Sequence, residues 1–202
     1  MHPSSLQNMT RFRAQYLHGR EAEPLRILDL GATAYDGCYR PVFAGENWHY
    51  LGVDLAPGDN VDLVLQEPYR WDEIASDSID VFVSGQVLEH AEYFWITMLE
   101  ISRVLKPGGL ACIIVPSAGP EHRFPLDCWR FYTDGMKAMA RFGRLAVLDA
   151  YTQWQGVGDG HPWNDSVLVA QKPLRPWWKR LGIRALQSLQ RRMMTIGLIR
   201  SV

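Results

Sequence analysis

The chain has 202 residues, of which 47% are hydrophobic and 21% are charged, enough for one globular domain with its own core. No apolar run approaches the roughly 18 residues of a membrane-spanning helix, and the first residues lack the apolar segment of a signal peptide. The cysteines Cys38, Cys112 and Cys128 have no metal-ligand spacing, so we expect reduced thiols in a cytoplasmic protein.

Charge is unevenly distributed along the chain. The formal net charge is −1, yet residues 174–202 hold seven basic residues and no acidic one, which leaves −8 on residues 1–173. An acidic body does not favour a groove for nucleic acid. We therefore expect no nucleic-acid partner for the main domain, and the basic tail needs a separate explanation.

Hydrophobic periodicity predicts an initial helix and then strands that alternate with helices. The predicted strands are residues 25–30, 48–53, 61–65, 79–83, 110–115, 144–151 and 166–171, and the predicted helices are residues 5–17, 86–105 and 134–142. Pro107 and Gly108 predict the end of the second helix. This order predicts an α/β fold with a doubly wound, mostly parallel sheet.

The first strand leads into LDLGATAYDG (28–37), where a ligand would lie beyond the carboxyl end of a parallel strand. A dinucleotide needs G-x-G-x-x-G, and the second glycine is absent, so NAD is disfavoured. A ligand without phosphates needs one close backbone approach, at Gly31, and an acid after the second strand to accept ribose hydroxyls. Asp54 stands at that position.

Residues 77–116, DSIDVFVSGQVLEHAEYFWITMLEISRVLKPGGLACIIVP, closely resemble class I S-adenosylmethionine-dependent methyltransferases. The matching parts are a D-x-I-D-V strand, VLEH after it, LKPGG at a helix end, and an apolar fifth strand. The resemblance spans about residues 25–172. It implies a Rossmann-like seven-stranded sheet with an antiparallel last strand, methyltransferase activity, and S-adenosylmethionine as cofactor. Residues 1–24 then form an N-terminal helical extension and residues 173–202 a tail.

The resemblance also implies where the cofactor binds. Asp29 and Gly31 match the family motif D-x-G-x-G-x-G, but Thr33 and Tyr35 replace its second and third glycines. We expect Thr33 to offer a hydroxyl to the cofactor carboxylate and Tyr35 to cover it. The candidate cofactor-binding residues, all at strand ends, are Asp29, Gly31, Ala32, Thr33, Asp54, Leu55, Gln66, Glu67, Gly85 and Gln86.

The segment after the fifth strand, PSAGPEHRFPLDCWRFYTDGM (116–136), resembles a subgroup of glycan and natural-product methyltransferases with H-R-(F/Y)-P-x-D-x-W-R-F. This implies a hydroxyl acceptor on a small molecule, a sugar or glycan intermediate. The candidate substrate residues are Arg123, Asp127, Trp129 and Arg130, and the two arginines are suited to a carboxylate or phosphate. Two alternatives stay open: another small-molecule or protein acceptor, or a binding module without catalysis.

A hydroxyl acceptor must lose a proton, and histidine accepts protons near neutral pH. Three histidines follow strands and are candidate bases: His90, His122 and His161. Asp159 and Asp165 flank His161, but a loop with two acids is more often solvated than metal-bound. The sequence therefore predicts no metal site.

The tail has the pattern of a basic amphipathic helix. On a helix, its apolar residues form one stripe and Arg180, Arg184 and Arg191 lie opposite. The stripe consists of Trp178, Leu181, Ala185, Leu189, Met193 and Ile196. This pattern suits an anionic membrane surface. Docking on a partner subunit, as in a homodimer, or on the acidic body of the same domain are the alternatives.

Overall fold

The computed structural model describes residues 3–35, 37–154 and 163–174, with residues 182, 183, 185, 188, 189 and 192 of the tail. Seven strands form one sheet: β1 (Arg26–Leu30), β2 (His49–Asp54), β3 (Leu63–Val64), β4 (Ile79–Gly85), β5 (Leu105–Pro116), β6 (Ala146–Thr152) and β7 (Asp165–Gln171). The helices are α1 (Pro3–Tyr16), α2 (Phe94–Val104), α3 (Thr133–Phe142) and the 3-10 helix η1 (Arg40–Phe43).

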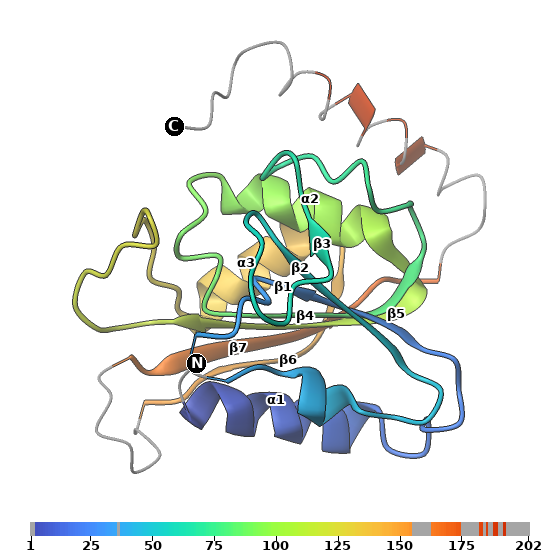
Figure 1. Ribbon diagram of the computed structural model, residues 1–202. Helices are drawn as coiled ribbons and strands as arrows, with labels where there is room; N and C mark the ends of the chain where they lie inside the picture. The colour runs from blue at the N-terminus through green and yellow to red at the C-terminus, as the bar shows by residue number, and fades with distance from the viewer. Residues whose placement is uncertain are drawn as a thin grey trace.

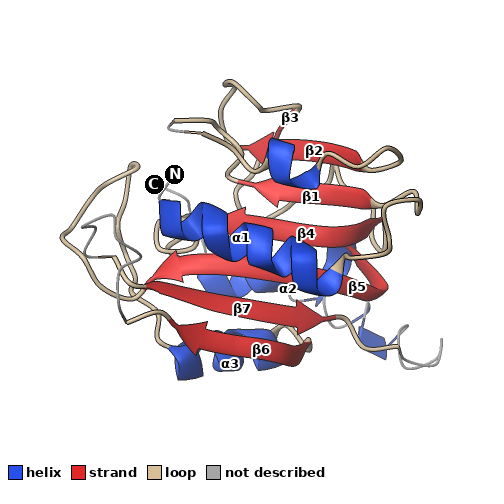
Figure 2. Ribbon diagram, turned by 90° about the horizontal axis from the view of Figure 1, so that it is seen from below, coloured by secondary structure: helices blue, strands red, loops and turns tan. Residues whose placement is uncertain are grey.

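The strand order is β3-β2-β1-β4-β5-β7-β6. Neighbouring strands from β3 to β5 pair in parallel, whereas β7 pairs antiparallel with both β5 and β6. The predicted doubly wound, seven-stranded sheet with an antiparallel last strand is therefore confirmed. The order reverses between β1 and β4, and the carboxyl ends of these parallel strands lie at one edge of the sheet (Figure 2).

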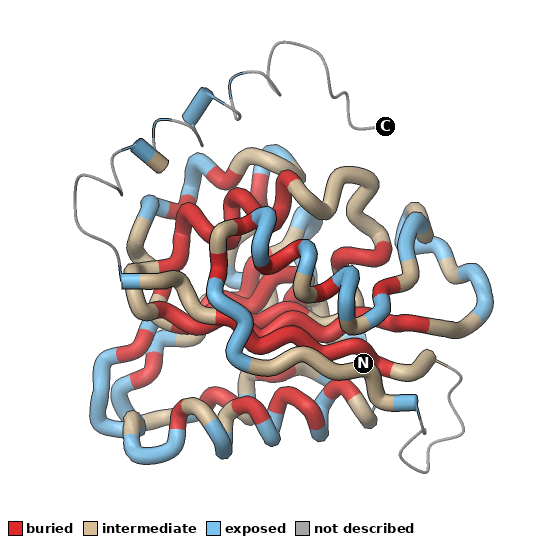
Figure 3. The backbone as a smooth tube through the Cα atoms, turned by 180° about the vertical axis from the view of Figure 1, so that it is seen from behind, coloured by how far each residue is buried: buried red, intermediate tan, exposed pale blue. Residues whose placement is uncertain are grey.

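Both faces of the sheet are covered. Figure 1 shows α1 and η1 on one side, and α2 and α3 on the other. Successive residues of β5 alternate between the two cores: Ala111 and Ile113 pack on the side of α2 and α3, and Cys112 and Ile114 pack on the side of α1. The buried residues accordingly concentrate in the central strands (Figure 3). This explains why residues 110–115 of β5 form an uninterrupted apolar run.

The N-terminal half of the sheet has few helices. Between β1 and β4, the described residues form one helix, the short η1. Large aromatic side chains cover this part of the sheet instead. Trp71, for example, is fully buried and stacked on Phe82, with ring centroids 6.2 Å apart. Its backbone amide donates to Glu100 of α2, and its carbonyl accepts from Arg103.

The predicted helix at residues 86–105 is wrong over its first eight residues, because α2 begins at Phe94. Contacts with distant residues replace the helical bonds there. The carbonyl of Glu89 accepts from the amides of Cys128 and Trp129, and the amide of Tyr93 donates to the Tyr69 hydroxyl. These contacts draw residues 86–93 into turns that face the carboxyl edge of the sheet.

The other predicted boundaries differ less from the observed ones. The strand predicted at 110–115 begins earlier, at Leu105, and a register shift between Ile79 and Val81 lets β5 pass the turn at Gly108. No described helix is long and apolar enough to cross a membrane. The helix predicted for residues 178–200 falls mostly outside the described residues and stays a prediction.

Candidate active site

Gly31 makes the turn after β1 possible. Its φ is +78°, and a Cβ at this position would lie 2.1 Å from Cγ2 of Val87. The amides of Gly31 and Ala32 both donate to the carbonyl of Val53 at the end of β2. The turn is therefore held against β2 and the segment after β4, at the point where the strand order reverses.

The loop after β2 holds the same turn from the other side. One carboxylate oxygen of Asp54 accepts from the amide of Thr33 (3.0 Å), and the other accepts from the amide of Leu55 (2.7 Å). Asn60 donates to the carbonyl of Ala32. These bonds fix the backbone of the turn without the missing glycines. A carboxylate has about four acceptor positions, so Asp54 can still accept ribose hydroxyls.

Asp29 is buried beneath this turn and 2% exposed. One of its carboxylate oxygens accepts from the Tyr50 hydroxyl, while the other, Oδ1, has no hydrogen-bond partner among the described residues. Burial raises the pKa of Asp29 to about 7, against the lowering effect of the Tyr50 bond. A buried carboxylate oxygen without a partner, next to a glycine that allows close approach, fits a ligand with an ammonium group. S-Adenosylmethionine has such a group and a ribose diol, so the residues present fit it.

Of the remaining predicted cofactor residues, two are exposed and two contact other parts of the protein. Gln66 and Glu67 are exposed beyond β3, where nothing described covers them. Gly85 instead makes room for Tyr39, whose hydroxyl would lie 1.9 Å from a Cβ there. Gln86 has a φ of +60°, and its side-chain amide donates to the carboxylate of Asp165 of β7 at 2.9 Å. The cofactor contacts of these residues stay predictions.

The segment at residues 117–131 is held by Arg130. Its guanidinium forms a two-pronged ion pair with Asp127 (2.6 and 2.8 Å) and donates to the carbonyls of Ala118 and Pro120. This pairing holds the pKa of the Asp127 carboxyl well below its usual range. Arg130 and Asp127, predicted to contact the substrate, thus have a clear structural task. Arg123 is exposed and pairs with Glu121, and its contact with an acceptor stays a prediction.

Aromatic side chains close this region. Trp129 donates from its indole to the carbonyl of Ala91, which ties the segment to the residues before α2. Tyr35 and Phe124 are exposed, and their rings meet across the turn with centroids 5.8 Å apart. Tyr35 thus packs against Phe124, and its expected covering of the cofactor carboxylate stays a prediction.

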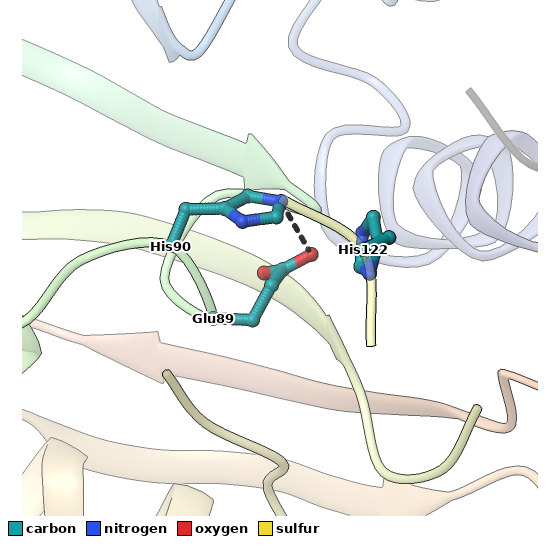
Figure 4. Close-up of side chains that lie close together, drawn as sticks. All are labelled: Glu89, His90 and His122. Carbon is teal, nitrogen blue, oxygen red and sulfur yellow. Dashed lines mark ion pairs between the residues drawn. The ribbon is translucent and has the colours of Figure 1, made fainter. Parts of the chain in front are cut away.

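Two of the three candidate bases lie together. The rings of His90 and His122 are in contact, with centroids 4.9 Å apart, and Glu89 lies beneath them (Figure 4). Oε1 of Glu89 is 3.7 Å from Nε2 of His90. His161 lies outside the described residues, although Trp163, just beyond it, packs against His122 with centroids 4.5 Å apart.

Glu89 was not among the predicted site residues. It is fully buried, and neither carboxylate oxygen has a hydrogen-bond partner among the described residues. Burial raises the pKa of Glu89 to about 8, and burial also lowers the pKa of His90. The signal was present in VLEH, where an acid precedes a histidine. Its approach to within 4.8 Å of His122 depends on how the segment after β5 folds back.

Comparison with known proteins agrees with this geometry. A family model described as a methyltransferase domain matches residues 28–113. A Mycobacterium avium protein named as an uncharacterized methyltransferase is 30% identical over 142 residues, which cover 63% of this chain and 53% of that protein. The chain therefore spans about half the length of that relative.

Two solved structures show the same fold. One is the 1,6-didemethyltoxoflavin-N1-methyltransferase of Burkholderia thailandensis with bound 1,6-didemethyltoxoflavin and S-adenosylhomocysteine, at a TM-score of 0.64 and 16% identity, covering 85% of this chain and 79% of that one. The other is the cyclase SpnF, at a TM-score of 0.62 and 14% identity, covering 84% and 82%.

The strand order, the glycine turn with Asp29 and Asp54, and the family match agree with one another. These comparisons support a class I S-adenosylmethionine-dependent methyltransferase, with residues 28–113 matching the methyltransferase domain.

Proposed function

We propose that this protein transfers a methyl group from S-adenosylmethionine to a hydroxyl of a small molecule, with a sugar or glycan intermediate as acceptor. The observation that carries the proposal is the cluster of Glu89, His90 and His122. Its residues follow β4 and β5, at the edge of the sheet where the glycine turn also lies. An acceptor hydroxyl must lose its proton, and this cluster has the lone pairs that favour that loss.

S-Adenosylmethionine, when bound, supplies an electrophilic methyl group. Because transfer is an in-line displacement, the protein's task is to align the acceptor and to exclude water. The ring contact of Tyr35 with Phe124 and the packing of Trp163 on His122 support water exclusion. The Arg130–Asp127 pair supports alignment, because it holds the segment that carries His122.

The acceptor class rests on the resemblance of residues 121–135 to glycan and natural-product methyltransferases. Exposed Arg123 supports an acceptor with a carboxylate or phosphate near the methylated hydroxyl. The toxoflavin-type neighbour methylates a nitrogen by its name, so nitrogen acceptors belong in the test panel.

A second candidate is a binding module without methyl transfer. It is favoured by Asp54, both of whose oxygens already accept backbone amides. The fold neighbour named as a cyclase illustrates that this fold also serves other reactions.

The first test is calorimetric titration with S-adenosylhomocysteine, comparing wild type with Asp54→Asn. Asparagine keeps one acceptor oxygen for the turn but loses the charge, so we expect at least about tenfold weaker binding with the fold intact. Transfer of labelled methyl to a panel of sugars, phenols and amines then identifies the acceptor class. Failure of the wild type to bind S-adenosylhomocysteine would favour the second candidate.

A further inference from the structure

We propose that Glu89, His90 and His122 form a binding site for a divalent first-row transition metal ion of the Zn²⁺ type. The sequence predicted no metal site, because Glu89 and His122 come from separate segments, one after β4 and one after β5. The proposal deepens the proposed function, on which it rests, by assigning a cation to the cluster where the acceptor hydroxyl loses its proton.

The three side chains converge on one point. One ligand atom from each lies within 4.8 Å of the other two, and Oε1 of Glu89 is 3.7 Å from Nε2 of His90. Ligand atoms around tetrahedral Zn²⁺ are about 3.3 Å apart, given metal–ligand bonds of about 2.0 to 2.2 Å. Side-chain rotations of about 1 to 1.5 Å would therefore complete the site. Two imidazoles and a carboxylate suit Zn²⁺, Co²⁺ or Fe²⁺ better than Mg²⁺ or Ca²⁺.

The surroundings of His90 resemble those of a metal-bound histidine, which donates a hydrogen bond from its second ring nitrogen to a carbonyl or carboxylate. Nδ1 of His90 lies 2.5 Å from the carbonyl of Leu126, so this nitrogen is the donor and Nε2 keeps its lone pair toward Glu89. Nδ1 of His122 lies 3.4 Å from Oδ2 of Asp127, which Arg130 holds in place. His90 is thus held from outside the cluster by a hydrogen bond, and His122 lies beside a carboxylate without bonding to it.

Glu89 supplies the independent observation. Its side chain is fully buried and neither carboxylate oxygen has a hydrogen-bond partner among the described residues. Burying an unpaired carboxylate is costly, and a cation held by the same cluster removes that cost. Arg130, the nearby cation, is already paired with Asp127 and lies outside the cluster. A hydroxyl bound to the metal ion becomes more acidic and releases its proton to water near neutral pH.

The experiment uses the full chain, stripped of metal with a chelator and titrated with Co²⁺. We expect about one Co²⁺ per chain, a visible absorption spectrum of four- or five-coordinate Co²⁺, and displacement by Zn²⁺. Glu89→Gln, His90→Asn and His122→Asn should each weaken Co²⁺ binding by more than tenfold. His49→Asn, at an exposed histidine of β2, is the matched control and should bind as the wild type does.

Thermal unfolding shows whether a variant loses metal binding only because it no longer folds. Glu89→Gln is nearly isosteric, so its metal-free melting temperature should stay close to that of the wild type. Zn²⁺ should raise the melting temperature of the wild type and leave that of Glu89→Gln unchanged. Absence of Co²⁺ binding, or equal binding by Glu89→Gln and His122→Asn, would overturn the proposal. Methyl transfer that persists in chelator would overturn the metal site and leave the proposed function standing. Failure to bind S-adenosylhomocysteine would count against the proposed function alone.

Discussion

At the residue scale, two positions control the cofactor turn: Gly31 provides the backbone shape, and Asp29 provides a buried carboxylate beneath it. Neither residue can be replaced without changing the turn. Gly31 faces Val87 at a distance that excludes a side chain, and Asp29 has one oxygen without a hydrogen-bond partner among the described residues. Each makes a separate prediction, one about steric fit and one about charge.

Gly31→Ala should abolish S-adenosylhomocysteine binding and destabilise the fold by about 1 to 3 kcal/mol. The added methyl would meet Val87 at 2.1 Å, with φ at +78°. Chemical denaturation and calorimetric titration measure the two effects. The matched control is Gly135→Ala in α3, where a Cβ meets nothing within 4 Å, and which should stabilise the fold by about 0.5 to 1 kcal/mol. Equal behaviour of the two variants would contradict the steric argument.

Asp29 should make stability depend on pH. Its pKa is raised to about 7 in the folded protein, whereas an unfolded aspartate titrates near about 3.9. The folded state therefore holds the proton longer, and the stability contributed by Asp29 falls as pH rises from about 4 to about 7. We expect Asp29→Asn to become more stable relative to the wild type over this range, by on the order of a few kcal/mol. Urea denaturation of both proteins at pH 5 and pH 8 measures this; a pH-independent difference would refute it.

At the element scale, the segment between β5 and α3 acts as one unit, held by the guanidinium of Arg130. It places His122 beside His90 and sets Phe124 on Tyr35. The turn before α2 takes part, because the carbonyls of Glu89 and Ala91 accept from this segment. The site is thus assembled by two non-helical segments packed on each other.

Arg130→Lys should loosen this segment, because lysine cannot reproduce the two-pronged pair with Asp127 and the bonds to Ala118 and Pro120. We expect faster amide hydrogen exchange at residues 117–131 and at least about tenfold slower methyl transfer. Arg123→Lys serves as the control for exchange, since Arg123 pairs with Glu121 alone at the surface. Unchanged exchange in Arg130→Lys would show that the pair does not hold the segment.

At the scale of the whole molecule, α1 belongs to the folded body. Its residues Met9 and Phe12 are buried in the core on one face of the sheet, and Ser5 is hydrogen-bonded to Tyr39 beside Gly85. The N-terminal extension therefore supports the carboxyl edge of β4. The tail is a different case, because its role rests on charge and periodicity.

Removal of residues 175–202 should leave cofactor binding unchanged and abolish binding to anionic vesicles. The removed residues hold the seven basic charges and the apolar stripe. Sedimentation with vesicles of anionic and of neutral lipid measures the effect. Equal sedimentation of the full and shortened chains would refute membrane contact, and a change in oligomeric state on removal would favour docking on a second copy.

The sequence by itself predicted the sheet, because each strand is a short apolar run that can be recognised from neighbouring residues alone. The motifs VLEH and LKPGG indicated the family. It also predicted a cofactor turn at Gly31, since Gly31 follows β1 and Asp54 ends β2 at the same edge of the sheet. Tertiary structure alone decided that residues 86–93 are not helical, because distant partners capture their backbone groups. It likewise decided the contact of Glu89 and His90 with His122. That contact joins segments 32 residues apart, counted from His90 to His122, and no periodicity in the sequence records how such a loop folds back.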